Sequence, residues 1–334
     1  MNKLKRAGII GTGSCLPDRI MTNHEFEEIV DTNDEWIKSH TGISERRFSD
    51  EKTATSDLST TAALRALESA KVKPEDIDLI IVATVTPDML FPSTACIVQK
   101  NIGAVNAAAF DLEAACTGFL YALAVAENFI MTGYYRNVLV IGAETLSKIC
   151  DQTDRNTCVI FGDGAGAAVV SEVPEEYGIL STYMGADGSG GDLLKLPAGG
   201  SRLPASVETV QERLHYIKMD GSKVFKFAVK VMGVAAEKAL EKCGLGKEEV
   251  DYLIPHQANI RIIDAAVKRL KISEEKVYVN IDKYGNMSAA SVAVALDEAS
   301  RKGLLKDGDI VVLVGFGGGL TWGAAVLKWR NFGR

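Results

Sequence analysis

The sequence predicts an α/β protein built from two related halves, and two observations carry that prediction. First, short apolar runs rich in β-branched residues alternate with helix-like segments along the chain. The runs at 79–83, 138–141 and 311–314 are apolar at every position, which is typical of strands buried on both faces of a parallel sheet. Second, segments of the first half recur in the second half at a fixed spacing.

Helical patterns separate the strands. The segments that we expect to be helical are 58–70, 118–131, 224–242 and 260–270. Because strands and helices alternate, we expect sheets that are covered by helices.

The recurring segments share an offset of 173 residues. Residues 75–80 resemble 248–253, residues 122–123 match 295–296, and residues 140–142 resemble 313–315 (248 − 75, 295 − 122 and 313 − 140). We therefore expect two duplicated βα halves related by a pseudo-two-fold axis, one at 1–174 and the other at 175–334. Equivalent loops of such halves meet at the carboxyl ends of the strands, where α/β proteins place their functional sites.

Composition excludes several classes of protein. The chain has 334 residues, of which 47% are hydrophobic and 24% charged, and a formal net charge of −7. A nucleic-acid-binding protein would need a basic footprint. The six cysteines form no CxxC pair, and we find no signal peptide and no apolar run long enough to span a bilayer. We therefore expect a cytoplasmic protein with reduced thiols and no insertion into a membrane.

Cys116 stands where an apolar helix is expected to begin. The positive end of a helix dipole favours a thiolate, so this position predicts a nucleophile with a lowered pKa. The structural alternative is a small residue that fits a core, since free cysteines are among the most buried residue types.

His256 and Asn286 are the corresponding candidates in the second half of the chain. His256 comes directly after an expected strand, and Asn286 lies three residues before Ala289, the position equivalent to Cys116 (289 − 116 = 173). Alone, the histidine could be solvated, and the asparagine could belong to a turn or a helix cap. The repeat brings all three residues to facing loops and so favours one shared pocket.

A glycine-rich segment at 315–323 follows the last apolar strand. Glycines let backbone N–H groups approach a substrate oxygen, so an oxyanion hole is the functional interpretation. A tight, closely packed turn is the structural alternative.

These motifs together resemble those of the β-ketoacyl-[acyl-carrier-protein] synthase III family. The similarity extends from end to end and is carried by segments 31–37, 114–119, 161–166, 255–259, 285–291 and 315–323. It implies a thiolase-like fold with α/β/α/β/α layers and a Cys–His–Asn triad of Cys116, His256 and Asn286. The implied activity is that of an acyltransferase of fatty-acid biosynthesis and lipid metabolism, which condenses a short acyl-coenzyme A primer with malonyl-acyl carrier protein through a cysteine acyl-enzyme.

The resemblance also implies roles for individual residues. Contacts with coenzyme A are implied for Thr32, Trp36, Arg155 and Asn259. An acyl pocket is implied for Phe91, Leu146, Phe161 and Leu194, with Phe91 reaching in from the partner of a homodimer. The N–H groups of Cys116 and Gly318 would form the oxyanion hole. Beyond the two substrates, coenzyme A thioester and acyl carrier protein, no cofactor and no metal is expected.

Acyl carrier protein is acidic in this family, so a chain of net charge −7 needs a local cluster of cations to bind it. The candidates are Lys226, Lys230, Arg261, Lys268 and Arg269. The alternative is that these side chains form an ordinary solvated face. Two positions depart from the family pattern beside the expected coenzyme A site, namely His40 where arginine is usual and Ser222 where asparagine is common.

Three other functions remain to be weighed. A related condensing or acyl-transfer enzyme of secondary metabolism would use the same triad, so the preferred primer and the pathway are not given by these motifs. An inactive scaffold is expected to lack one of the three residues, yet all are present. A thiol redox protein usually needs a neighbouring second cysteine, and none is adjacent to Cys116.

Overall fold

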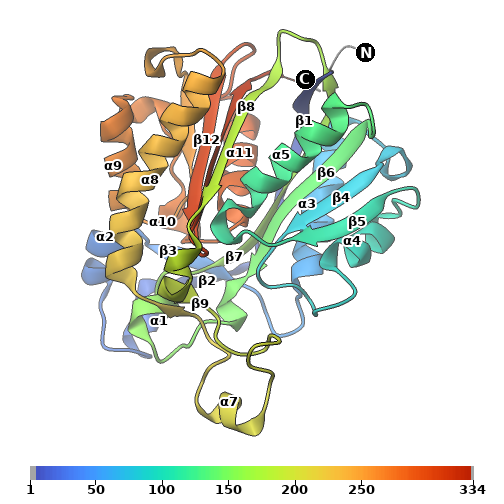
Figure 1. Cartoon of the computed structure of the whole chain (residues 1–334). Helices are drawn as coiled ribbons and strands as arrows, with labels where there is room; N and C mark the ends of the chain where they lie inside the picture. The colour runs from blue at the N-terminus through green and yellow to red at the C-terminus, as the bar shows by residue number, and fades with distance from the viewer. Residues whose placement is uncertain (1–4, 332–334) are drawn as a thin grey trace.

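Two β-sheets, each lying between layers of helices, form the frame of the protein (Figure 1). The computed structural model describes residues 5–331, so residues 1–4 and 332–334 of the two expected halves lie outside the described range. The first sheet contains, in spatial order, β1 (Arg6–Cys15), β7 (Asp163–Val173), β6 (Asn137–Thr145), β4 (Leu79–Ala83) and β5 (Ala108–Leu112). The second contains β8 (Gly178–Ala186), β13 (Thr321–Lys328), β12 (Ile310–Gly317) and β11 (Tyr252–Pro255).

The two sheets have the same strand order and directions, as the repeat predicts. The order β1-β7-β6-β4 of the first sheet corresponds to β8-β13-β12-β11 of the second. In each sheet the parallel pair β4 with β6 or β11 with β12 is continued on one side by antiparallel strands, and in the first sheet β5 adds a second parallel pair on the other side of β4. The first sheet draws its strands from residues 6–173 and the second from residues 178–328.

The helices make three layers around these sheets. The outer layer on the first sheet consists of α3 (Thr55–Ala70) and α4 (Thr94–Ile102), and that on the second of α8 (Gly221–Lys242) and α9 (Ile260–Leu270). Between the sheets lie α5 (Gly118–Met131) and α11 (Ala290–Arg301), whose apolar side chains share one core with both sheets. The α/β/α/β/α layering expected from the resemblance is therefore confirmed (Figure 1).

The local sequence explains where these elements begin and end. The bounds of α5, α9 and β4 agree with those expected, while β6 and β12 continue past Gly142 and Gly315, where the apolar pattern ends. Asn259 is the N-cap of helix α9, and its side-chain oxygen accepts the N–H of Arg261 at 2.9 Å, the usual satisfaction of a free helical N–H. None of the helices within residues 5–331 combines the length and apolar character needed to cross a bilayer.

The smaller elements gather around one end of the layered frame (Figure 1). They comprise the hairpin of β2 (Arg19–Thr22) and β3 (Glu45–Phe48), the pair β9 (Leu194–Lys195) and β10 (Lys218–Met219), and the helices α1 (Asn23–Glu27), α2 (Asp34–Thr41), α6 (Arg155–Cys158), α7 (Val207–Gln211) and α10 (Ile281–Tyr284). This end corresponds to the carboxyl ends of β4, β6, β11 and β12, so these segments enclose the predicted site.

Each half touches the other through a glycine in its central strand. A Cβ atom at Gly142 of β6 would lie 2.3 Å from the carbonyl oxygen of Ala289, just before α11. At the equivalent Gly315 of β12 (315 − 142 = 173), a Cβ atom would lie 3.6 Å from the carbonyl oxygen of Cys116. The start of each central helix therefore rests on the opposite sheet. At Gly142 only glycine permits so close an approach, whereas the distance at Gly315 is that of an ordinary van der Waals contact.

We predict that Gly142→Ala destabilises the protein by about 1–3 kcal/mol, the usual cost of overpacking. The added methyl group would meet backbone atoms of Ala289, which cannot move aside as a flexible side chain could. Gly188→Ala is the matched control, because no atom lies within 4 Å of the place that its methyl group would take, and its effect should stay within about 0.5 kcal/mol. Urea unfolding measures the free energy of unfolding of both variants, and equal values would contradict the contact between the halves.

Candidate active site

Cys116 lies in a short 3₁₀ turn, η2 (Ala115–Thr117), between β5 and the start of α5. The hydroxyl of Thr117 donates to the carbonyl oxygen of Ala114 at 2.7 Å and lies 2.9 Å from the hydroxyl of Thr321, which fixes the turn to the second half. Ala115 has φ of 45°, a left-handed conformation that non-glycine residues seldom adopt. Cys116 is therefore presented on a strained turn that both halves hold in place.

The thiol is not poised as a thiolate in the resting protein. Burial, together with a smaller effect of the negative charge of Glu144, raises the pKa of Cys116 to about 12. The expectation of a lowered pKa was wrong, because loss of hydration at a fully enclosed sulfur outweighs the field of one helix end. Deprotonation must accompany the attack on a substrate.

His256 continues from β11 into the site. Its backbone N–H donates to the carbonyl oxygen of Val314 at 2.7 Å, which extends the pairing of β11 with β12 by one residue. The ring packs edge-on against Phe316, with ring centroids 5.7 Å apart, and burial lowers its pKa to about 3. Neither ring nitrogen has a hydrogen-bond partner among the described residues. The imidazole is therefore neutral, and its one N–H remains available to a substrate.

Asn286 is held by the first half of the chain. Its backbone N–H donates to the carbonyl oxygen of Ile160 at 2.9 Å, and its carbonyl oxygen accepts the N–H of Gly162 at 3.0 Å. Its side-chain oxygen accepts the N–H of Ser288 at 2.9 Å. This bond fixes which way the amide points, so the amide N–H₂ group is left to donate elsewhere.

The structure brings the three predicted residues together. Cys116, His256 and Asn286 line one cavity of about 770 Å³. A second cavity of about 720 Å³ also reaches Cys116, and both share Phe161 and Leu194 as walls. The thiol therefore stands where two cavities meet, one on each side.

The first cavity contains most of the residues expected to contact coenzyme A. Trp36, Arg155 and Asn259 line it, together with His40 and Ser222, whereas Thr32 is not part of its lining. The Trp36 ring stacks on His40 at 4.5 Å between centroids, and the Arg155 guanidinium lies 4.6 Å from the centre of the same ring.

The side chain of Asn259 is already used within the protein. Its amide group donates to the carbonyl oxygen of His40 at 2.8 Å, and its oxygen caps α9. Asn259 therefore joins α2 to α9 at the cavity, in addition to any contact with a ligand.

The second cavity contains most of the expected acyl pocket. Leu146, Phe161 and Leu194 line it, while Phe91 is not part of its lining and is 86% exposed. Gly318 and Gly319 line the same cavity beside Cys116. At the neighbouring Gly317 a Cβ atom would lie only 2.7 Å from the backbone nitrogen of Cys116, so the glycine segment passes directly beside the nucleophile.

The candidate cations for carrier binding lie on α8 and α9, which pack against each other. The buried stripe of α9 consists of Ile262, Ile263, Ala266, Val267 and Leu270, as the sequence predicts. Lys226, Lys230 and Lys268 are exposed, and Lys226 lines the first cavity. Arg261 donates to the carbonyl oxygen of Ser39 at 2.8 Å, and Arg269 forms an ion pair with Glu237 at 2.8 Å. Arg269 is thus less available to a partner than the sequence suggests.

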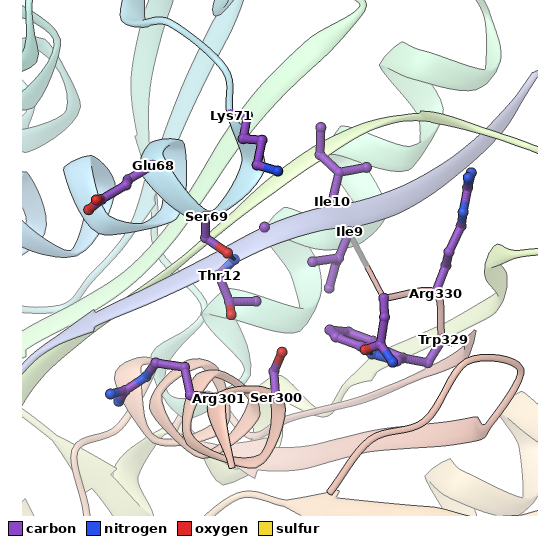
Figure 2. Close-up of a pocket in the computed structure, with 12 residues that line it drawn as sticks. Ile9, Ile10, Thr12, Glu68, Ser69, Lys71, Ser300, Arg301, Trp329 and Arg330 are labelled. Carbon is purple, nitrogen blue, oxygen red and sulfur yellow. Dashed lines mark hydrogen bonds between the residues drawn. The ribbon is translucent and has the colours of Figure 1, made fainter. Parts of the chain in front are cut away.

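A third cavity, of about 310 Å³, lies away from Cys116 between α3, β1 and the end of α11 (Figure 2). It is lined by Lys71, Arg301 and Arg330 and by several polar residues, but by none of the predicted site residues. Arg301 at its edge is bound to the buried carboxylate of Asp297 at 2.9 Å. This cavity has no part in the site around Cys116.

Sequence reasoning missed two buried residues next to the nucleophile, Glu144 and Ser288. Glu144 is completely buried near the carboxyl end of β6, and Ser288 lines the second cavity. Two sequence signals could have found them. Glu144 is an acid that directly follows the apolar run 138–143, and Ser288 is the repeat equivalent of Ala115 (288 − 115 = 173).

A duplicated five-layered α/β fold, with a buried cysteine where two cavities meet and a histidine and an asparagine beside it in one of them, defines a condensing enzyme of the thiolase fold. Comparison with known families narrows this class. Residues 110–188 match the family model for 3-oxoacyl-[acyl-carrier-protein (ACP)] synthase III, and residues 240–329 match the model for its C-terminal part. The chain belongs to the β-ketoacyl-[acyl-carrier-protein] synthase III family.

Individual relatives agree with this assignment. The β-ketoacyl-[acyl-carrier-protein] synthase III of Caldanaerobacter subterraneus is 66% identical over 97% of this chain and 98% of its own length. The crystal structure of the 3-oxoacyl-[acyl-carrier-protein] synthase III of Aquifex aeolicus is 50% identical, covers 97% of this chain and 100% of its own, and has a TM-score of 0.89. The priming β-ketosynthase of the R1128 polyketide pathway is 37% identical, covers 98% and 97% respectively, and also has a TM-score of 0.89.

We predict that His256 makes the protein less stable as the pH falls below about 6.5. Its folded pKa of about 3 lies below its ordinary value, so only the unfolded chain takes up a proton between these two values. The free energy of unfolding should therefore lose up to about 1.4 kcal/mol per pH unit through this residue. Urea unfolding of the wild type and of His256→Gln between pH 7.5 and 5 gives the slope of the free energy of unfolding against pH for each protein. The difference between the two slopes is the contribution of His256. Identical slopes would show that the folded ring accepts a proton.

Proposed function

We propose that Cys116, His256 and Asn286 are the catalytic residues with which this enzyme condenses an acyl-coenzyme A primer with malonyl-acyl carrier protein. The product is a 3-oxoacyl-acyl carrier protein, and the reaction initiates fatty-acid synthesis. One observation carries the proposal: three side chains from separate segments, two of them in the second half, line one cavity. A nucleophilic thiol with two neutral hydrogen-bonding groups suits acyl transfer followed by decarboxylation.

In the first step the Cys116 sulfur attacks the thioester carbonyl of the acyl-coenzyme A. A bond forms between the sulfur and the acyl carbon, the bond to the coenzyme A sulfur breaks, and coenzyme A leaves. The N–H groups of Cys116 and Gly318 form the oxyanion hole for this step, which fits the position of Gly318 in the cavity that also contains the thiol.

In the second step malonyl-acyl carrier protein loses carbon dioxide, and the resulting carbanion attacks the acyl-enzyme. A carbon–carbon bond forms, the bond between the acyl carbon and the Cys116 sulfur breaks, and the released sulfur takes up a proton to restore the thiol. Negative charge develops on the malonyl thioester oxygen and needs donors that are in place beforehand. The neutral imidazole of His256 donates from one nitrogen, and Asn286 donates from its amide group. The bond from Ser288 to the amide oxygen of Asn286 supports this assignment, since it turns the N–H₂ group away from Ser288.

The two cavities suit the two parts of the primer. The first, lined by Trp36, Arg155 and Asn259, receives coenzyme A, and we assign Thr32 to the same substrate although it does not line the cavity. The Arg155 guanidinium now covers the Trp36 ring, so an adenine ring would have to insert between them or stack beside them. The second cavity receives the acyl chain against Leu146, Phe161 and Leu194.

The enzyme acts as a homodimer in this proposal. Strand β5 is the edge of the first sheet, and Leu90 and Phe91 beside it are 83% and 86% exposed. Unpaired strand edges and large exposed apolar side chains favour association. Phe91 of one protomer would enter the acyl cavity of the other. The enzyme works in the cytoplasm on these two substrates and needs no metal or further cofactor.

A related condensing enzyme of secondary metabolism is the second candidate function. The R1128 priming ketosynthase shares the fold at 37% identity, but the Caldanaerobacter synthase is far more similar at 66%. Identity therefore favours the role in fatty-acid synthesis. A redox function is disfavoured, because Cys116 is the only cysteine among the described residues that line the two cavities.

We predict that the two half-reactions respond to different substitutions. Cys116→Ala should abolish the mass increase that acyl-coenzyme A produces, because the sulfur is the acceptor. Asn286→Ala should keep that adduct but lose malonyl decarboxylation by about 10²–10³-fold, the cost of one missing oxyanion donor. Intact-mass spectrometry with a panel of acyl-coenzyme A thioesters measures the first step and shows the preferred primer. Release of labelled carbon dioxide measures the second. An unchanged adduct in Cys116→Ala would refute the proposed function.

We also predict that Lys230 and Lys268 attract the acidic carrier. Both are exposed on the paired helices α8 and α9, and neither forms a salt bridge within residues 5–331. Lys230→Glu with Lys268→Glu should raise KM for malonyl-acyl carrier protein about tenfold or more and leave acylation by acyl-coenzyme A unchanged. The matched control, Lys73→Glu with Lys306→Glu, changes the net charge equally at the amino ends of β4 and β12. An equal rise in KM for malonyl-acyl carrier protein in both double variants would show that net charge alone is responsible.

A further inference from the structure

Glu144 is a buried carboxyl group that the proposed steps do not use. It lies near the carboxyl end of β6 and is 0% exposed. One of its oxygens accepts from the hydroxyl groups of Thr86 at 2.7 Å and Thr84 at 3.2 Å. The N–H of Val85 lies 3.1 and 3.3 Å from its two oxygens.

All of these donors are neutral, and no cation forms a salt bridge with Glu144 within the described part of the chain. Burial raises the pKa of the carboxyl to about 7. Unlike an exposed glutamate, Glu144 exchanges its proton in the physiological range.

Ser288 lies between Glu144 and the nucleophile. Ser288 and Cys116 line the same cavity. Gly142, which lies on the same face of β6 as Glu144, packs against Ala289, the residue after Ser288. Burial raises the pKa of the Cys116 thiol and of the Glu144 carboxyl, and the Ser288 hydroxyl opposes that rise at both groups. The hydroxyl oxygen is buried and has no hydrogen bond of good geometry within residues 5–331. It is therefore committed to neither neighbour and can rotate between them.

The backbone of Ser288 is strained at this position. Its φ of 46° is almost identical to the 45° of Ala115, its repeat equivalent. A glycine would adopt this conformation without strain, so the serine brings a side chain at the expense of stability. Because this cost is accepted at a position next to the thiol, we infer that the Ser288 hydroxyl has a function.

The other titratable groups that face the thiol are poorer bases. His256 is neutral, and burial lowers its pKa to about 3, so it accepts a proton only with difficulty. Glu113 is exposed, and one of its oxygens accepts the N–H of Ala115 at 3.1 Å. Glu144 is the remaining base near the sulfur.

We propose that Ser288 and Glu144 form a proton relay that deprotonates Cys116 as it attacks the acyl-coenzyme A. The Ser288 oxygen takes the proton of the thiol and passes its own proton to the Glu144 carboxylate, while the sulfur–carbon bond forms. As the bond to coenzyme A breaks, the proton returns along the same hydroxyl to the leaving sulfur, so the relay ends as it began. This substrate assignment rests on the proposed function, but the relay itself concerns only the thiol.

The test is the rate at which iodoacetamide alkylates Cys116 as a function of pH, followed by the mass of the peptide that contains it. In the wild type the rate should rise as the pH passes through about 7, when Glu144 becomes a base. Glu144→Gln and Ser288→Ala should lose this rise and react about a hundredfold more slowly at pH 7.5, a typical contribution of general base catalysis. Ala115 shows that alanine adopts the required backbone conformation in this fold.

The opposite result is expected if Glu144 acts only through its charge. A nearby carboxylate raises the pKa of the thiol, so removing it would make Cys116 more reactive. An alkylation rate that is unchanged or increased in Glu144→Gln would overturn the relay. If that variant does not fold, Ser288→Ala carries the same test, with an unchanged rate as the contrary outcome.

Glu127→Gln is the matched control. Glu127 is also buried with a raised pKa, but it lies farther along α5 and is bound to Thr182 at 3.2 Å. Its variant should be alkylated at the wild-type rate. If the alkylation rates of the variants change as the relay predicts but acyl-coenzyme A never labels Cys116, the proposed function is refuted and the relay is still supported.

Discussion

The close contact between the two halves is the constraint on which the rest of this structure depends. Gly142 receives the backbone of Ala289, and the equivalent Gly315 lies beside the carbonyl of Cys116. Each central helix therefore starts on the opposite sheet, and the loops that precede the helices are pressed together. Because both contacts involve backbone atoms, their geometry does not depend on side-chain rotamers. A duplicated fold thus creates one asymmetric site from two equivalent loops.

Burial at this meeting point determines the electrostatics of the site. Loss of water keeps the Cys116 thiol protonated and the His256 imidazole neutral, and it brings the pKa of Glu144 close to neutrality. A neutral histidine is suited to donate a hydrogen bond to an enolate, but it is a weak base. The two tasks, removal of a proton from the thiol and stabilisation of the malonyl oxygen, are therefore best assigned to different residues.

The two equivalent turns diverge only in their side chains. Ala115 and Ser288 share one strained conformation, yet the first precedes the nucleophile and the second bonds to Asn286 through its N–H. The same backbone conformation thus precedes the buried thiol of Cys116 in one half and orients the amide of Asn286 in the other. Such strain persists because packing of both halves over-determines the turns.

The sequence by itself determined the layered fold, the repeat and the three candidate catalytic residues. These follow from local patterns, since buried strands need apolar runs, amphipathic helices need an apolar stripe, and a common offset of 173 residues pairs distant loops. Only the tertiary structure decided the state of the thiol, the pairing of Arg269 with Glu237 and the place of Glu144 beside Ser288. Desolvation and contact between remote segments depend on how completely a group is enclosed, and no local pattern around Cys116 records that enclosure.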